Sequence, residues 1–491
     1  MKHIGLRFLA LLVFYSCAVC FAESEASDDA IALVIDILKS GEQGMQAVAM
    51  AMVRETPGTE VTKALVKELP NLSPAAQIQL LSALADRGDR TALPAVITAT
   101  KTEEPSIRIA ALKAIGQLGD ASSVTLLAQT AANSSPEEQK AARESLYRLR
   151  GQKIDEAILA GICCADPKVK VELIHSVGER YIIAGVQTLL KTAQDPDSEV
   201  QRESFKVLKV IADEKYLPAL VELLLKIESA SIRSEAEKTV AAVAHKIEDR
   251  RRRLGSGPGL RPGRQAEAVL AALPEVADTQ KRCSLLSVLG RIGDDSALPA
   301  IRKALSSGNA KEQDAAIRAL SDWPNSKPLN DLLKIAKTSD NQIHRILALR
   351  GFVRLLGLTL DTRPKTQDQS LESVVLSLES TVMLYQQAMD LAPSLPEKRM
   401  VLSGLSYVKS LAALEMAASY LQDETLLPEA EMAVVKIAEG IFESHPQPAE
   451  GGLDPVQGFA LAKDILNKII QTTKNDLLRQ QAQKIVKQIK N

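Results

Sequence analysis

Hydrophobic residues recur at steps of three and four positions along most of this chain, and short turns separate the stretches that carry them. In residues 105–132, for example, the hydrophobic positions are Ile107, Ile109, Leu112, Ile115, Val124, Leu126 and Leu127. This spacing predicts amphipathic helices that each bury one face. Two such helices fit between one turn and the corresponding turn of the next unit.

The turn itself returns about every 30 residues. It contains glycine or alanine, often followed by aspartate, and occurs at Arg87-Gly88-Asp89, Leu118-Gly119-Asp120, Arg150-Gly151, Val177-Gly178, Ile211-Ala212-Asp213 and Ile292-Gly293-Asp294. Repetition at this length, with two helices in each unit, is typical of helical solenoids. We therefore predict an all-α fold, an α-solenoid of stacked helical hairpins in which each repeat contacts only its neighbours.

The repeated units resemble HEAT repeats of the bacterial kind, similar to those of phycobilisome lyases. The family pattern runs as Val-Arg, Ala-Ala-x-x-Ala-Leu, Gly-Asp and Ala-Leu-Pro-x-Leu. It is matched by Ile107-Arg108, Ala110-Ala111-Leu112 and Leu118-Gly119-Asp120, and again by Leu289-Gly290-Arg291-Ile292-Gly293-Asp294 with Ala297-Leu298-Pro299-Ala300-Ile301. The resemblance covers most of residues 74–360 and implies HEAT-like hairpins that bind other molecules along an extended surface.

A second resemblance lies near the C-terminus. The stretches Leu402-Ser403-Gly404-Leu405 and Ala412-Ala413-Leu414 resemble the closing repeats of secreted bacterial HEAT-repeat proteins. Some proteins of that group carry a sugar-processing β-domain. This sequence has no strand-rich segment of that kind, so the resemblance implies the repeat and not the activity.

Opposite charges recur in the repeats as well. Arginine follows the start of several first helices, as at Arg108, Arg202 and Arg233, and aspartate follows the small residue of the turn. We expect these arginines and aspartates to pair between neighbouring repeats and so to fix their stacking register.

The N-terminal segment, residues 1–22, has the pattern of a secretory signal peptide. A basic start that includes Lys2 precedes an uncharged hydrophobic core, and Ala22 completes a small-x-small cleavage pattern. We predict cleavage after Ala22, a periplasmic or secreted protein, and no membrane span after cleavage, because the core is short for a span. The alternatives are a retained anchor or a lipid attached at Cys17 or Cys20.

Glycine, proline and arginine interrupt the repeats in residues 246–264. This density of glycine and proline ends a helix. We predict an N-terminal solenoid over residues 23–245, an Arg/Gly/Pro-rich linker or loop over 246–264, and a C-terminal solenoid over 265–491. Further loops are expected at residues 361–369 and 444–455.

Composition and charge narrow the possible functions. Aromatic residues make up only 3% of the chain, which counts against sugar sites and single-stranded nucleic-acid platforms, because both use exposed rings. The net charge is −1, and −3 without residues 1–22, so nothing draws the protein to nucleic acid in general.

Three cysteines remain after the predicted cleavage: Cys163, Cys164 and Cys283. An adjacent pair and one distant cysteine form no disulfide framework. We expect all three to be buried small hydrophobic side chains.

No catalytic or metal-binding pattern is present in the sequence. The five histidines form no His-Glu-x-x-His pair, and there is no zinc spacing, nucleophile elbow or phosphate-binding loop. We therefore predict no enzymatic activity, no catalytic residue, no cofactor and no metal. The single tryptophan, Trp323, precedes Pro324 at a helix end, and we expect it to pack between repeats instead of binding a ligand.

The best candidates for a binding site are six arginines: Arg250, Arg251, Arg252, Arg253, Arg261 and Arg264. Guanidinium groups at this density create a local positive potential that suits a phosphate, a sulfated glycan or an acidic protein. The alternative is structural, since arginines at a helix C-terminus interact favourably with the helix dipole and then enter a solvated loop.

Together these features predict a non-enzymatic, extracytoplasmic HEAT-repeat scaffold that binds another protein on its concave face and does not bind nucleic acid. One alternative is a carbohydrate-utilisation accessory protein, which the resemblance to secreted relatives suggests. The other is a bilin lyase-like protein, which the predicted export disfavours because bilin attachment takes place in the cytoplasm.

Overall fold

A computed structural model describes residues 28–40, 43–254, 265–361, 377–444 and 455–489. Within these residues the chain forms 26 α-helices and six short 3₁₀ helices, and no strand. This confirms the predicted all-α solenoid. The chain divides into two compact units, and each is described by itself.

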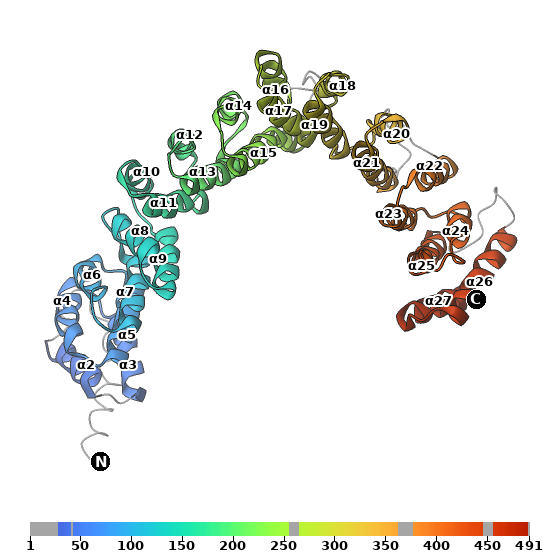
Figure 1. Ribbon diagram of the computed structural model, residues 1–491. Helices are drawn as coiled ribbons and strands as arrows, with labels where there is room; N and C mark the ends of the chain where they lie inside the picture. Colours follow the sequence, from blue (N-terminus) through green and yellow to red (C-terminus); the bar gives the residue numbers. More distant parts are fainter. Residues whose placement is uncertain (1–27, 41–42, 255–264, 362–376, 445–454, 490–491) are drawn as a thin grey trace. The chain divides into compact units, whose positions relative to one another are not determined.

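The first unit spans residues 1–211. Its odd-numbered helices α3 to α13 pack in succession, and the even-numbered helices form a second layer, most of which packs directly against them (Figure 1). The helices are α2 (Asp28–Ser40), α3 (Gln43–Glu55), α4 (Thr59–Glu68), α5 (Pro74–Arg87), α6 (Leu93–Ala99), α7 (Pro105–Leu118), α8 (Ser123–Asn133), α9 (Pro136–Arg148), α10 (Ile154–Cys164), α11 (Pro167–Glu179), α12 (Val186–Thr192) and α13 (Ser198–Ile211).

The second unit spans residues 212–491 and repeats this arrangement, with α15 to α27 as the odd-numbered layer (Figure 1). Its helices are α14 (Leu217–Lys226), α15 (Ala230–Leu254), α16 (Glu267–Ala272), α17 (Thr279–Ile292), α18 (Leu298–Leu305), α19 (Ala310–Ser321), α20 (Leu329–Thr338), α21 (Gln342–Asp361), α22 (Leu378–Leu391), α23 (Leu395–Leu405), α24 (Leu411–Ala418), α25 (Leu427–Ser444), α26 (Pro455–Thr472) and α27 (Asp476–Ile489).

Four odd-numbered helices of the first unit begin with proline, and their starts are 31 residues apart. Pro74, Pro105, Pro136 and Pro167 open α5, α7, α9 and α11, and Ser198 opens α13 after the same interval. Proline at the first helical position loses no backbone hydrogen bond, and its fixed φ suits the helix. In these four repeats the proline therefore marks the start of the odd-numbered helix in the sequence.

Buried glutamates pair with a basic residue of the preceding repeat. Arg143 donates two hydrogen bonds of 2.7 Å to Glu172, and the Nε2 atom of His175 lies 2.9 Å from Glu203. Pairs of the same kind are Arg108–Glu138, Arg282–Glu312 and Arg350–Glu397. These pairs form a ladder along the odd-numbered layers of both units.

The predicted ladder between arginines and the aspartates of the turns is therefore wrong about the acidic residues, because the arginines pair with glutamates of the next repeat. Asp89 accepts a hydrogen bond of 3.0 Å from the backbone N–H of Thr91, and Asp294 does the same with Ser296. An aspartate side chain is short, so it binds the free N–H groups of the helix that follows it. Asp89 also accepts a hydrogen bond of 2.6 Å from the hydroxyl of Thr62 in the preceding repeat. Its partner there is a threonine and not an arginine, whereas the glutamates of the next helix pair with basic side chains.

A second set of contacts joins successive odd-numbered helices at their C-terminal ends. Arg180, directly after α11, donates to the carbonyls of Tyr147 (3.0 Å) and Leu149 (2.8 Å) at the end of α9. Arg354 of α21 donates to the carbonyls of Ser321 and Trp323 after α19. The last carbonyls of a helix lack partners within it, so each arginine closes the helix of the repeat before it.

Glycine brings neighbouring helices of the odd-numbered layer into close contact. A Cβ atom added to Gly290 of α17 would lie 2.5 Å from the Cα atom of Ala319 in α19, and one added to Gly351 of α21 would lie 2.6 Å from the Cβ atom of Ser321. These distances are too short for non-bonded carbon atoms. The helices therefore approach each other as closely as they do because no side chain stands between them.

Replacing Gly290 with alanine is expected to lower the free energy of unfolding by about 1–2 kcal/mol, because overpacking at this contact outweighs the gain in helix propensity. The matched control is Gly357→Ala, since a Cβ atom at Gly357 meets nothing within 4 Å. That control is expected to raise stability by about 0.5–1 kcal/mol. Urea unfolding followed by circular dichroism measures both, and equal effects would contradict the close contact.

Several predicted segments fall wholly or partly outside the described residues. These are the signal peptide, residues 255–264 of the predicted linker, and most of the loops expected at 361–369 and 444–455. Helix α15 continues to Leu254, so the first nine residues of the segment predicted as a linker or loop are helical. The proposed division into solenoids over 23–245 and 265–491 stays a prediction.

The prediction for the cysteines is wrong, whereas the prediction for the tryptophan is confirmed. Cys163 and Cys164 are exposed at the end of α10 and Cys283 is partly exposed, so the expectation of buried cysteines is wrong. In α10 the buried positions are Ile154, Ile158 and Ile162, which leaves the cysteines that follow them on the outer face. Trp323 is fully buried, which confirms its expected packing role.

Candidate binding face of the second unit

An open hollow of about 480 Å³ lies on the odd-numbered layer of the second unit. Helices α15, α17 and α21 and the residue after α19 contribute its walls. The residues that line it are Lys238, Ala241, Ala242, His245, Arg291, Asp322 and Arg354. A volume of this size is typical of sites that accommodate a small ligand or a few side chains of a partner.

Small residues on α15 and close contacts between the other helices form the hollow. Ala241 and Ala242 occupy one turn of α15 between two longer basic side chains. The ring of His245 lies 2.9 Å from the carbonyl oxygen of Arg291, which joins α15 to the end of α17. The glycine contacts described above bring α17, α19 and α21 close together on the other side of the hollow.

The lining of the hollow is mainly cationic. Lys238, Arg291 and Arg354 carry positive charge, and Asp322 is the single carboxylate of the lining. Lys238 lies 3.2 Å from Glu235 on its own helix. Burial lowers the pKa of Arg354, and nearby Asp322 partly opposes this. An arginine nevertheless stays charged at physiological pH, so the hollow attracts negative groups.

This arrangement suits the binding of carboxylates. Arg291 presents several N–H donors in a planar fork that matches the two oxygens of a carboxylate. Arg354 already donates to the carbonyls of Ser321 and Trp323, so it contributes mainly its charge. Lys238 adds a flexible point charge at the rim. The two alanines leave room for the backbone or an apolar side chain of a bound segment. The lining is thus chemically suited to a negatively charged group.

The arginine cluster that the sequence singled out is only partly placed by the structure. Arg250 to Arg253 belong to α15, one to two turns after His245, and their side chains lie outside the described part of the chain. Arg261 and Arg264 lie outside it altogether. Their role in binding stays a prediction. The structure does place four of the six on the helix that forms one wall of the hollow.

Sequence reasoning missed Lys238, Arg291 and Arg354 as binding residues. The stripe of Lys238, Ala241, Ala242 and His245 was the available signal, because these residues share one face of a helix at steps of three and four. Arg291 also belongs to the repeat motif, which accounts for it without a binding role. The convergence of three helices on one hollow is not visible in a linear sequence.

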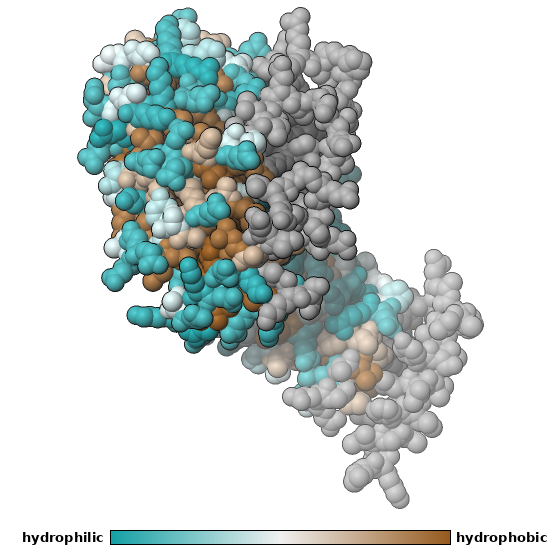
Figure 2. All heavy atoms as spheres, turned by 90° about the vertical axis from the view of Figure 1, so that its right-hand side faces the viewer, coloured by the Kyte–Doolittle hydropathy of each residue, from teal (hydrophilic) through white to brown (hydrophobic). Residues whose placement is uncertain are grey.

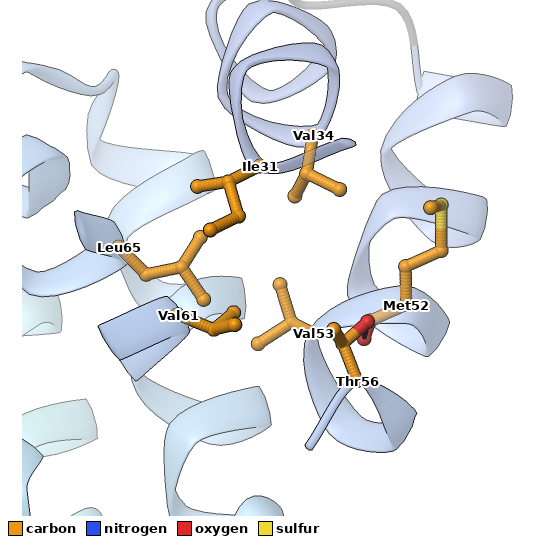
Figure 3. A pocket seen from close by; sticks show the side chains of 7 residues that line it. All are labelled: Ile31, Val34, Met52, Val53, Thr56, Val61 and Leu65. Atoms are coloured by element: carbon orange, nitrogen blue, oxygen red, sulfur yellow. Dashed lines mark hydrogen bonds between the residues drawn. The ribbon is translucent and has the colours of Figure 1, made fainter. Parts of the chain in front are cut away.

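A second cavity, of about 20 Å³, lies among α2, α3 and α4 in the first unit. Figure 3 shows that side chains of all three helices point into it. Its lining is apolar apart from Thr56 and consists of Ile31, Val34, Met52, Val53, Thr56, Val61 and Leu65. Such a space barely holds one water molecule, so it is a packing gap and not a ligand site.

The remaining surface offers less distinctive features. Figure 2 shows hydrophobic side chains exposed among hydrophilic ones on the side of the second unit that faces right in Figure 1. Scattered exposed hydrophobic residues are common on proteins and alone do not identify a site. Within the described ranges, no three His, Cys, Asp or Glu side chains are grouped to hold a metal ion. None of the described helices combines the length and hydrophobicity of a membrane span.

Comparison with known proteins assigns the repeats. The family model for HEAT repeats matches residues 62–147, 156–241 and 266–351, which together make up more than half of the chain. The chain belongs to the HEAT-repeat family. The matched segments of this HEAT-repeat protein include α17 and α19 and parts of α15 and α21. Of the residues that line the hollow, Lys238, Ala241, Arg291 and Asp322 lie within these segments. No curated protein sequence matches the chain.

Solved structures with a similar fold include two karyopherins and importin beta. Kap121p bound to Ste12p superposes with a TM-score of 0.50 and 12% identity, over 94% of this chain and 53% of that one. For Kap95p with RanGDP the TM-score is 0.49 and the identity 13%, over 94% and 66%. For importin beta they are 0.42 and 13%, over 93% and 72%. The HEAT-repeat protein thus spans about half to two thirds of the two karyopherins, and the likeness shows the fold alone.

Proposed function

We propose that this protein is an exported HEAT-repeat scaffold that binds an acidic segment of another protein in the hollow of its second unit. The observation that carries the proposal is the convergence of Lys238, Arg291 and Arg354 on one open space with a single carboxylate. Solenoids of this fold bind protein segments elsewhere, as the structure of Kap121p bound to Ste12p illustrates.

Electrostatic attraction is the main contribution that this site offers. Positive groups around an open hollow speed the encounter with a negative segment, and salt weakens that attraction. Affinity for an acidic partner should therefore fall as ionic strength rises. A glycan or a bilin, the ligands of the two alternative functions, would be distinguished by titration of the same protein with those molecules.

Export is proposed from the N-terminal pattern of residues 1–22. Expression of the full chain in a bacterial host, followed by cell fractionation and N-terminal sequencing, tests this part separately. A periplasmic product that begins at Glu23 is the expected result. A full-length product in the cytoplasm would contradict export. It would not contradict the proposed binding site, which is tested separately.

Reversing the charges of Lys238 and Arg291 to glutamate is expected to weaken binding of a labelled peptide rich in aspartate and glutamate by about tenfold or more, which corresponds to about 1.4 kcal/mol. Both side chains are exposed, so folding should be preserved. Fluorescence anisotropy at low salt gives the dissociation constants.

The matched control reverses Lys303 of α18 and Lys334 of α20, two exposed lysines on the even-numbered layer of the same unit. It changes the net charge by the same amount and should leave binding within about twofold. If both double variants lose affinity equally, the peptide senses only the total charge and the hollow is not the site.

A further inference from the structure

Three exposed hydrophobic residues lie at or just after the C-terminal ends of α11 and α13 in the first unit. Tyr181 is 57% exposed, Ile183 is 52% exposed and Val210 is 49% exposed. The ends of the two helices concerned are in contact, since a Cβ atom added to Gly178 of α11 would lie 3.2 Å from Val207 of α13. Tyr181 and Val210 each follow one of these contact residues by three positions, so they extend toward the same edge.

The backbone of Tyr181 is strained. Its φ is 53°, in the left-handed region that side chains rarely adopt. The corresponding positions after α5 and α17 hold Gly88 (φ 74°) and Gly293 (φ 66°). A hydrogen bond of 2.9 Å from the N–H of Ile182 to the carbonyl of Val177 fixes the turn, and glycine is the usual residue there. A large aromatic ring thus occupies a position where glycine would be more stable.

Basic residues outnumber acidic ones at the helix ends near this edge. Arg180 holds the end of α11 against the end of α9 through the carbonyls of Tyr147 and Leu149. Arg180 also forms an ion pair of 2.8 Å with the exposed Asp155. The other exposed charges at the ends of α9, α11 and α13 and at the start of α10 are Arg148, Arg150, Lys153, Lys206 and Lys209, against Glu156 and Glu179. Lys206 is paired with the buried Glu203. The rim therefore carries a net positive charge around an apolar centre.

We propose that Tyr181, Ile183 and Val210 form a docking site for an acidic protein segment, one of whose hydrophobic side chains packs on the Tyr181 ring. Aromatic residues at the centre of an interface carry much of its binding energy, and strain that persists at an exposed position is a mark of function. The positive rim selects an acidic partner. This site lies on the first unit, so it is separate from the hollow of the second.

Tyr181→Gly is the decisive variant, because it removes the ring and relieves the backbone strain together. We expect its urea midpoint to equal or exceed that of the parent protein. The probe is a labelled peptide in which leucine and phenylalanine stand among aspartates and glutamates. Both proteins carry Lys238→Glu and Arg291→Glu, so that the hollow does not contribute to binding. Affinity should fall by about tenfold in Tyr181→Gly.

Tyr181→Phe keeps the ring and is expected to bind within about twofold of the parent. A peptide with glutamine in place of its acidic residues should bind at least about tenfold more weakly to the parent. Equal affinity of parent and Tyr181→Gly would overturn the proposal, as would a lower urea midpoint for Tyr181→Gly, which would show that the ring supports the fold. Binding to phosphatidylglycerol vesicles in place of the peptide would assign the site to a lipid surface and also overturn it.

Discussion

Replacing Trp323 with alanine is expected to lower the free energy of unfolding by about 4 kcal/mol. The indole side chain is fully buried just after the end of α19. The backbone carbonyl of Trp323 accepts a hydrogen bond from Arg354 of the next odd-numbered helix. Its neighbour Pro324 lies against the turn of the preceding repeat, where a Cβ atom on Gly293 would be 2.1 Å from the proline ring. Removal of the indole therefore leaves a cavity where three repeats meet.

The control is Trp323→Phe, which keeps most of the volume. The indole N–H has no hydrogen-bond partner among the described residues, so its loss costs no hydrogen bond, and we expect a decrease of about 1–2 kcal/mol. Chemical unfolding gives both values. Hydrogen–deuterium exchange should show faster exchange in α19 and α21 of the alanine variant. A loss below about 1 kcal/mol for Trp323→Ala would show that the indole is not a packing centre.

Replacing Glu138 with alanine is expected to lower the free energy of unfolding by about 2–3 kcal/mol. The glutamate side chain is only 8% exposed and pairs with Arg108 of the preceding repeat. It also accepts hydrogen bonds from the backbone N–H (3.2 Å) and the hydroxyl (3.0 Å) of Ser135 at the start of α9. Removal leaves a charge without its partner in a mostly buried site. Because Arg108 is 26% exposed, water moderates the loss.

The neighbouring Glu137 is the matched control, since it is exposed in the same helical turn, and Glu137→Ala should change stability by less than about 0.5 kcal/mol. Acidification gives a second test. Burial opposes ionisation of Glu138, but its bonds with Arg108 and Ser135 outweigh this and lower its pKa. Its contribution is therefore complete above the ordinary glutamate pKa and is lost as pH falls through the lower folded value.

The stability difference between the parent protein and Glu138→Gln should therefore narrow below about pH 4.5. A difference that stays constant down to the onset of acid unfolding would mean that the charge of Glu138 contributes nothing. Glu203 and Glu397 of other rungs also have lowered pKa values, as the bonds they accept outweigh their burial. The same loss is thus expected along both units.

The sequence predicts the helices well because their signals are local. Proline at the first position, a capping side chain before it and hydrophobic residues at helical steps all act within one helix. Helix α11 illustrates this, as it starts at Pro167 with Asp166 as its cap. Its end was harder to place. Gly178 was interpreted as the turn, but the helix continues to Glu179 and Tyr181 makes the turn.

The error at Gly178 has a physical cause. Glycine serves two purposes in this fold, a left-handed turn at Gly88 and close helix contact at Gly178 and Gly290, and the sequence does not distinguish them. The glutamate partners of the ladder and the hollow were missed for a related reason. Both depend on which residues of different repeats lie side by side, and that is set by the stacking of helices.

The equal spacing of Pro74, Pro105, Pro136 and Pro167 has a consequence for how such a chain changes its length. Each interval contains one complete hairpin with its own start, and the intervals that begin at Pro105 and Pro136 also supply the basic residue that pairs with a glutamate of the next repeat. Deletion or duplication of one whole interval would join ends that already match, because each repeat contacts only its neighbours. The first unit is thus modular. Duplication of one interval would lengthen the solenoid and leave the packing within the existing repeats unchanged.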